Sequence, residues 1–169
     1  MQGQWYTFRR MIKPVLQFVS DFASKIYIVG AFSLLFLWFL WSQGFYREIT
    51  FSFFVFGSPL VSVILKNLFK RMRPKTAHIP KSDKFDYYGF PSGHTLFYTV
   101  YWGFLLYLSF ALAMPAAVLW GLRVLALFFL SLVGVSRVYL GKHWVADVIG
   151  GYFFGGLYLA GLIFCYTGF

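Results

Sequence analysis

Apolar residues along this chain are grouped in long blocks that polar turns separate. Five blocks have about the length that a helix needs to cross a membrane: residues 26–42, 49–65, 96–114, 116–135 and 144–166. Backbone polar groups find no partners in lipid, so each block is expected to be a helix. Gly57-Ser58-Pro59 predicts a kink within the second block. The pattern therefore predicts an all-α fold, a polytopic membrane helix bundle with about five transmembrane helices.

Residues 1–25 follow a different pattern from the blocks behind them. Apolar side chains recur at steps of three and four from Phe8 to Phe22, and basic side chains such as Arg10 and Lys13 lie between them. This spacing predicts an amphipathic helix. Its aromatic start favours a helix that lies at the membrane interface. A helix packed against the protein itself is the competing interpretation.

The last apolar block contains a Gly151-x3-Gly155 pair. Two small residues at this spacing allow another helix to approach closely. The second helix can belong to the same chain, which is the commoner use, or to a second copy.

Composition agrees with a membrane protein and restricts its partners. Hydrophobic residues make up 60% of the 169 residues and aromatic residues 24%, which is too apolar for a water-soluble domain of this size. The formal net charge of +10 suits anionic lipid headgroups or phosphate substrates. No soluble basic domain is present for nucleic acid. We therefore expect the bilayer and a membrane lipid substrate as partners, and leave the oligomeric state open.

Three polar clusters occur at ends of the apolar blocks, at residues 66–74, 91–94 and 136–147. The first cluster follows the second block, the second precedes the third block, and the third joins the last two blocks. If each block crosses the membrane once, all three clusters face the same side. Such a convergence favours a built site over scattered surface charge.

The residue types in these clusters suit a phosphate group. Three cations can surround an anion: Lys66, Arg73 and Arg137. The hydroxyl of Ser92 and the backbone around Gly93, at a predicted helix start, add donors. The chain offers no acidic set for Mg²⁺ and no Cys/His set for zinc, so we expect metal-free phosphoryl transfer and no cofactor.

One histidine and one aspartate are spaced to act as a pair. If the last helix begins near Lys142, His143 and Asp147 stand at i and i+4 on one face. The carboxylate can then hold one imidazole nitrogen and leave the other, unprotonated, to attack. A helix start that merely carries charges at a membrane surface is the alternative.

In their order and spacing, the clusters resemble the three signature motifs of the type 2 phosphatidic acid phosphatase family. The matching segments are Lys66-x6-Arg73-Pro74, Pro91-Ser92-Gly93-His94 and Ser136-Arg137-x5-His143-x3-Asp147. The resemblance implies one membrane-embedded phosphatase domain over residues 1–169, with an N-terminal amphipathic segment at 1–25 and an active-site loop at 66–94. Membrane members of the family usually have six spans, so five spans and an interfacial helix would be a departure.

The resemblance also implies a role for each motif residue. His143 would be the nucleophile and form a phosphohistidine, and Asp147 would orient it. His94 would protonate the leaving oxygen and then activate water. The remaining motif residues would hold the phosphate oxygens: Lys66, Arg73, Ser92, Gly93 and Arg137. His78 matches no motif and is interpreted as an ordinary loop residue.

The implied activity is hydrolysis of a phosphate monoester or diphosphate on a lipid headgroup. The short chain resembles compact bacterial members that act on lipid A, so lipid A 1-phosphate is the expected substrate. Undecaprenyl diphosphate and phosphatidylglycerophosphate are the alternatives. The segment from Lys75 to Phe90 is expected to choose among them. A small transporter or scaffold is the non-enzymatic alternative, although it would not need convergent histidines.

The side of the membrane on which the clusters lie is contested. The N-terminal segment, the clusters and the segment from Lys75 to Phe90 share this side and together hold 13 of the 15 Lys and Arg, which by the positive-inside rule would make it cytoplasmic. Bacterial lipid phosphatases of the resembled family usually act on the periplasmic side. We therefore expect a multi-pass protein of the bacterial inner membrane with a periplasmic active site.

Overall fold

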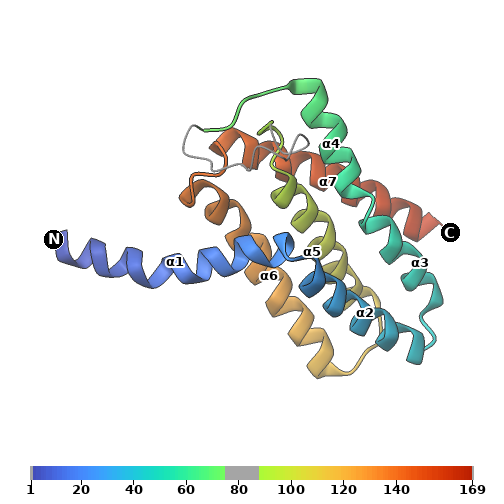
Figure 1. Cartoon of the computed structure of the whole chain (residues 1–169). Helices are drawn as coiled ribbons and strands as arrows, with labels where there is room; N and C mark the ends of the chain where they lie inside the picture. The colour runs from blue at the N-terminus through green and yellow to red at the C-terminus, as the bar shows by residue number, and fades with distance from the viewer. Residues whose placement is uncertain (1, 75–87, 169) are drawn as a thin grey trace.

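The structure, a computed structural model, describes residues 2–74 and 88–168 (Figure 1). Its helices, in chain order, are α1 (Gln2–Ser24), α2 (Ile26–Ser42), α3 (Tyr46–Val55), α4 (Ser58–Phe69), α5 (Gly93–Ala111), α6 (Ala116–Tyr139) and α7 (Val145–Gly168). In the described part of the chain, the one extended pairing is an isolated bridge between Met72 and Tyr88. The prediction of an all-α membrane helix bundle is confirmed.

Helix boundaries follow the apolar blocks with two informative differences. The predicted kink separates α3 from α4, and Pro59 lies in the first turn of α4, where its missing N–H removes no helical hydrogen bond. The fourth block extends beyond its predicted end, because α6 continues to Tyr139. Arg137 therefore belongs to the last turn of a helix.

The central helix is α5, which packs against α1, α3, α4, α6 and α7 (Figure 1). Its largest fully buried side chains include Tyr98, Trp102 and Phe104. The Trp102 ring stacks on Phe129 of α6, with centroids 4.6 Å apart. Because α5 begins at Gly93, this packing also fixes the position of the second polar cluster.

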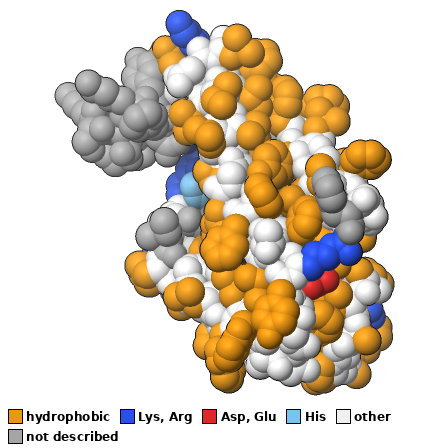
Figure 2. All heavy atoms as spheres, turned by 90° about the vertical axis from the view of Figure 1, so that its right-hand side faces the viewer, with side chains coloured by type: hydrophobic (Ala, Val, Ile, Leu, Met, Phe, Trp, Pro, Cys, Tyr) orange, Lys and Arg blue, Asp and Glu red, His pale blue; other side chains and the backbone are white. Residues whose placement is uncertain are grey.

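Among the described residues, three helical segments are long and apolar enough to cross a membrane: Tyr46–Phe69, Ala116–Tyr139 and Val145–Gly168. A fourth is added if Arg10–Phe22 and Tyr27–Ser42, which meet at a bend of 67°, are counted as one broken span. In Figure 2, hydrophobic side chains cover most of the visible face and charged side chains occupy only small areas. The protein has membrane-spanning helices, and the count of five stays a prediction.

The end of α1 packs against the bundle. Leu16, Val19 and Phe22 are buried, and Phe22 lies 4.6 Å from Phe129 of α6, centroid to centroid. A second apolar stripe, which includes Met11 and Phe18, remains exposed on the same helix. The end of α1 is therefore packed against the protein itself, which was the competing interpretation of the N-terminal segment. The exposed stripe still suits contact with lipid. In Figure 1 the first half of α1 extends away from the bundle.

The glycine pair of the last helix faces α5. A Cβ atom at Gly151 would lie 2.7 Å from the Cβ of Thr95, and one at Gly155 would lie 2.8 Å from the Cβ of Thr99. Real Cβ atoms do not approach other atoms this closely. The GxxxG pair thus serves packing inside one chain, and it holds the start of α7 against the start of α5.

Candidate active site

The first cluster meets the N-terminus of α5 through a buried lysine. Lys66 lies in the last turn of α4 and is buried. A Cβ atom on Gly93 would lie 3.6 Å from the Lys66 ammonium nitrogen. The ammonium group therefore lies next to the start of α5. An ammonium beside the positive end of a helix dipole favours an anion at that place.

Ser92 caps α5 and connects it to α7. Its hydroxyl oxygen lies 3.5 Å from the Thr95 amide nitrogen and accepts a hydrogen bond from the Thr95 hydroxyl at 3.0 Å. The Ser92 N–H donates to the Asp147 carbonyl at 2.8 Å. A serine at the N-cap is favoured for helix formation alone. Here it also joins the second cluster to the third.

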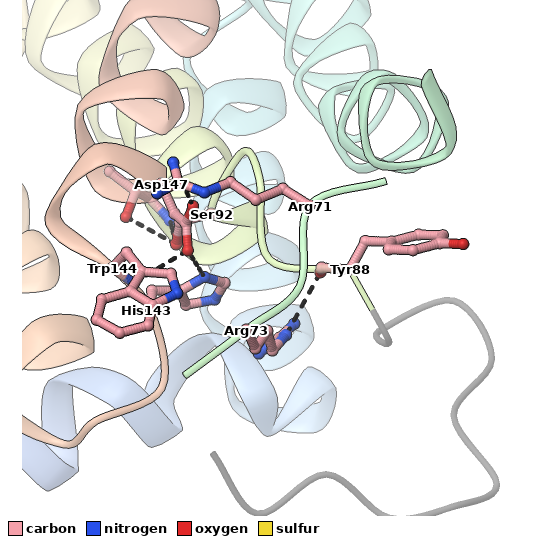
Figure 3. A network of polar contacts seen from close by, with 8 residues as sticks. Arg71, Arg73, Tyr88, Ser92, His143, Trp144 and Asp147 are labelled. Carbon is pink, nitrogen blue, oxygen red and sulfur yellow. Dashed lines mark hydrogen bonds and ion pairs between the residues drawn. The ribbon is translucent and has the colours of Figure 1, made fainter. Parts of the chain in front are cut away.

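Asp147 and His143 form the pair that the sequence predicts, but on a different backbone. The last helix begins at Val145, not near Lys142, so His143 precedes it. The helix starts there because Oδ2 of Asp147 accepts the Trp144 N–H at 3.0 Å, which is half of a capping box. The same oxygen lies 3.5 Å from Nδ1 of His143 (Figure 3). This distance is longer than that of a normal hydrogen bond.

Burial keeps the imidazole of His143 neutral. The side chains of His143 and Asp147 are 1% and 0% exposed. Burial lowers the pKa of His143 from 6.5 to about 4, and the charges of Arg137 and Arg73 act in the same direction, against the opposing effect of Asp147. At neutral pH the ring therefore carries one proton. If Asp147 holds that proton at Nδ1, the lone pair at Nε2 is available for attack.

Two arginines approach the pair from the loop after α4. Nη1 of Arg71 lies 3.4 Å from Oδ1 of Asp147, whereas Nε of Arg73 donates to the Tyr88 carbonyl at 3.4 Å (Figure 3). Gly89 lies between Asp147 and Arg73: a Cβ atom there would lie 2.9 Å from Oδ2 of Asp147 and 3.1 Å from Cγ of Arg73. Sequence reasoning missed Arg71 and Gly89. Arg71 was visible only as one charge in a basic cluster, and nothing marked Gly89.

Arg137 is buried and reaches toward α1. Its Nη1 donates to Oγ of Ser20 at 2.7 Å, and its carbonyl accepts the His143 N–H at 3.2 Å. On the next turn of α1, Oγ of Ser24 lies 2.8 Å from Nε2 of His94. Ser20 and Ser24 were also missed, because two serines on the polar face of an amphipathic helix carry no distinctive signal.

Close approaches or shared neighbours connect seven of the predicted site residues: Lys66, Arg73, Ser92, Gly93, Arg137, His143 and Asp147. The eighth, His94, contacts Ser24, which is joined through Ser20 to Arg137. Their catalytic and binding roles stay predictions. His78 and residues 75–87 of the expected specificity segment lie outside the described residues. Within the part of the chain that the structure describes, no three His, Cys, Asp or Glu side chains are grouped to hold a metal ion.

These features define a class: a helical membrane protein whose buried His–Asp pair is surrounded by cations at the helix ends. Comparison with known families identifies the family to which such a site belongs. Residues 47–168 match the model of the PAP2 superfamily. The chain belongs to this superfamily, and the family resemblance of the three motifs is confirmed.

Two relatives are informative. The chain is 38% identical over 107 residues to "Phosphatidylglycerophosphatase B" of Bacillus subtilis (strain 168), covering 60% of this chain and 49% of that protein. It thus spans about half the length of that relative. It also resembles the crystal structure of the "first transmembrane PAP2 type phosphatidylglycerolphosphate phosphatase" from Bacillus subtilis, with a TM-score of 0.66, 25% identity, and coverage of 90% and 75% of the two chains. Neither comparison supports the expectation of lipid A.

Proposed function

We propose that this protein is a membrane lipid phosphatase that removes the terminal phosphate of phosphatidylglycerophosphate through a phosphohistidine. The observation that carries the proposal is the buried, neutral imidazole of His143 beside Asp147, with Arg73 near it from the loop after α4 and Arg137 from the end of α6. Membership of the PAP2 superfamily supports it. A transporter or scaffold would have no use for a buried neutral nucleophile of this kind.

In the first step, Nε2 of His143 attacks phosphorus and the bond from phosphorus to the lipid oxygen breaks. His94 donates a proton to the departing oxygen, so phosphatidylglycerol leaves with a free headgroup hydroxyl. Asp147 stabilises the positive charge that develops on the imidazole. The three cations, with Ser92 and the N–H of Gly93, hold the non-bridging oxygens as charge develops: Lys66, Arg73 and Arg137.

In the second step, His94 takes a proton from water and the water oxygen attacks phosphorus. The bond between phosphorus and Nε2 of His143 breaks, inorganic phosphate leaves, and the imidazole returns to its neutral form. This two-step scheme needs no metal ion, because positioning and the cations supply the charge stabilisation.

The choice of phosphatidylglycerophosphate rests on the names of the two relatives and replaces the earlier expectation of lipid A 1-phosphate. The cations contact only phosphate oxygens in this scheme, so the motifs themselves do not separate the candidate lipids. We propose that the protein lies in the bacterial inner membrane with its active site on the periplasmic side, as its family usually does.

The decisive experiment measures phosphate release by the purified protein in detergent from phosphatidylglycerophosphate, phosphatidic acid, undecaprenyl diphosphate and lipid A. We expect the highest kcat/KM with phosphatidylglycerophosphate, full activity in chelator, and inhibition by vanadate, which mimics pentacoordinate phosphorus. A strict Mg²⁺ requirement would contradict the mechanism. Faster turnover of lipid A would restore the first expectation, and release from no lipid would contradict the proposed function.

A further inference from the structure

We propose that the last two turns of α1 are part of the active site, with Ser20 positioning Arg137 and Ser24 positioning His94. This inference rests on the proposed function. It concerns a segment outside residues 47–168, which are the ones that match the family model. The contacts join α1 to the second and third polar clusters at once.

Ser20 is a meeting point for two cations. It is fully buried, and its Oγ accepts hydrogen bonds from Nη1 of Arg137 at 2.7 Å and from Nζ of Lys142 at 3.1 Å. A hydroxyl oxygen has two lone pairs, so one serine can serve both donors. Burial and the nearby Arg137 charge lower the pKa of Lys142. One neutral oxygen thus fixes two like charges side by side, where an anionic phosphate would be attracted.

Ser24 is placed to hold the imidazole of His94 in one orientation. Its Oγ donates to the Ser20 carbonyl at 3.2 Å, and it lies 2.8 Å from Nε2 of His94. A hydroxyl has one hydrogen. If that hydrogen is on the Ser20 carbonyl, Oγ accepts from Nε2–H and selects one tautomer of the ring. A residue that gives and takes protons depends on both its tautomer and its orientation.

The core fixes this end of α1, so the two serines are presented by a supported helix turn. The Tyr98 hydroxyl of α5 donates to the Val19 carbonyl. Next to it, the Phe22 ring packs against Phe129 and Trp102, with centroids 4.6 and 5.8 Å away. Groups that position a reacting side chain need such support, because small displacements cost rate.

Replacing the two serines by alanine should change different kinetic parameters. Ser20→Ala loosens a phosphate-binding cation, so KM for lipid phosphate and the vanadate Kd should each rise about three- to tenfold, with little change in kcat. Ser24→Ala should lower kcat/KM for lipid phosphate by a similar factor. It should leave kcat/KM for p-nitrophenyl phosphate unchanged, because nitrophenolate departs without a proton from His94.

Two further variants make the test specific. Ser24→Thr keeps a hydroxyl on the exposed Ser24 position and should restore activity on the lipid. Ser131→Ala is the matched control, because Ser131 is exposed on α6 and donates to the Phe128 carbonyl of its own helix at 3.1 Å. It should behave like wild type. Thermal unfolding of each variant in detergent shows whether it is folded.

Three outcomes would overturn the inference while leaving the proposed function intact: wild-type kinetics in both alanine variants, equal losses on lipid and aryl phosphate in Ser24→Ala, or no recovery in Ser24→Thr. If wild-type protein released phosphate from no substrate, the proposed function would fail by itself. Vanadate binding can be measured by thermal shift even if the wild-type protein turns over no substrate. Equal vanadate affinity in wild type and Ser20→Ala would then show that Ser20 is not part of the anion-binding site.

Discussion

Asp147 shows how one side chain can serve both folding and chemistry. Its Oδ2 caps the first turn of α7 through the Trp144 N–H and also faces Nδ1 of His143, while Oδ1 faces Arg71. An acidic residue in a first helical turn is favourable by itself, because it complements the helix dipole. The signal that starts the helix therefore also places the carboxylate beside the imidazole of His143.

Replacing His143 should abolish activity, whereas replacing His78 should have little effect. His143→Ala should reduce phosphate release by a factor on the order of 10³ or more, because a nucleophile and the groups that serve it act as a unit. His78→Ala, which changes a residue outside every motif, should stay within a few-fold of wild type. Comparable activities for the two variants would refute the assignment of His143.

The depressed pKa of His143 should appear as a pH dependence of stability. The folded state holds this group neutral down to a pKa of about 4, whereas the unfolded chain binds the proton near 6.5. The stabilising contribution is therefore complete above pH 6.5 and is lost as the pH falls toward 4. Between pH 7.5 and 5, wild-type protein should lose more thermal stability than His143→Asn. Parallel losses in thermal unfolding would show that His143 is not buried in its neutral form.

At the residue scale, sequence reasoning identified the groups that spacing marks and missed those that only contact reveals. The motif spacing pointed to Arg137, His143 and Asp147, and the structure places them together. Ser20 lies more than a hundred positions before Arg137 in the chain, and no pattern relates the two. Such contacts depend on how α1 docks, which follows from side-chain packing and not from local periodicity.

Among the elements, α5 and α7 determine whether the polar clusters meet. Both helices begin at the site, and the Ser92 N–H donates to the Asp147 carbonyl between their first turns. The glycines of α7 allow the two backbones to approach along the following turns. Close packing of small residues is a main source of helix association in membranes.

Filling this contact should destabilise the protein and separate the clusters. A Cβ atom at Gly155 would lie 3.0 Å from the Leu96 carbonyl oxygen, whereas one at Gly156 meets nothing within 4 Å. Gly155→Val should therefore cost about 1–3 kcal/mol of stability, in the range of overpacking, and reduce activity. Gly156→Val is the matched control and should be close to neutral. Equal thermal unfolding midpoints in detergent for the two variants would contradict this packing role.

At the element scale, the apolar blocks predicted the helices well because lipid and core both require helical, apolar segments. Block 26–42 coincides with α2, and the Gly57-Ser58-Pro59 kink became the break between α3 and α4. The start of α7 was placed too early, because the Asp147 carboxylate caps the Trp144 N–H and the helix begins only at Val145. Hydropathy also could not show that α5 is surrounded by other helices, since burial in protein and burial in lipid select similar residues.

At the scale of the whole molecule, charge is divided unequally between the two ends of the bundle. Arg123 donates to the Ser109 carbonyl at 2.7 Å near the end of α5, and Arg47 lies over the Tyr166 ring near the end of α7. The other 13 of the 15 Lys and Arg belong to the N-terminal segment, the clusters and the segment from Lys75 to Phe90. If the motif cations Lys66, Arg73 and Arg137 are set aside, ten cations remain on the side of the site and two on the other side.

This imbalance and the proposed location oppose each other, so the topology is worth measuring directly. The positive-inside rule assigns the side with ten cations to the cytoplasm. The proposed location is nevertheless the periplasmic side, because cations near a phosphate site can also serve anionic headgroups and so weaken the charge argument. We therefore expect Met72, which is exposed beside the site, to face the periplasm and Gln43, at the end of α2, to face the cytoplasm.

Single cysteines at these two positions would test the topology, in a Cys165→Ser background because Cys165 is a free, exposed thiol. On intact spheroplasts, a membrane-impermeant maleimide should label Met72→Cys and spare Gln43→Cys. After permeabilisation both should react, which controls for accessibility. Labelling of Gln43→Cys alone on intact cells would invert the topology. The active site would then meet phosphatidylglycerophosphate in the cytoplasmic leaflet, and the side with most of the cations would be cytoplasmic, as the positive-inside rule states.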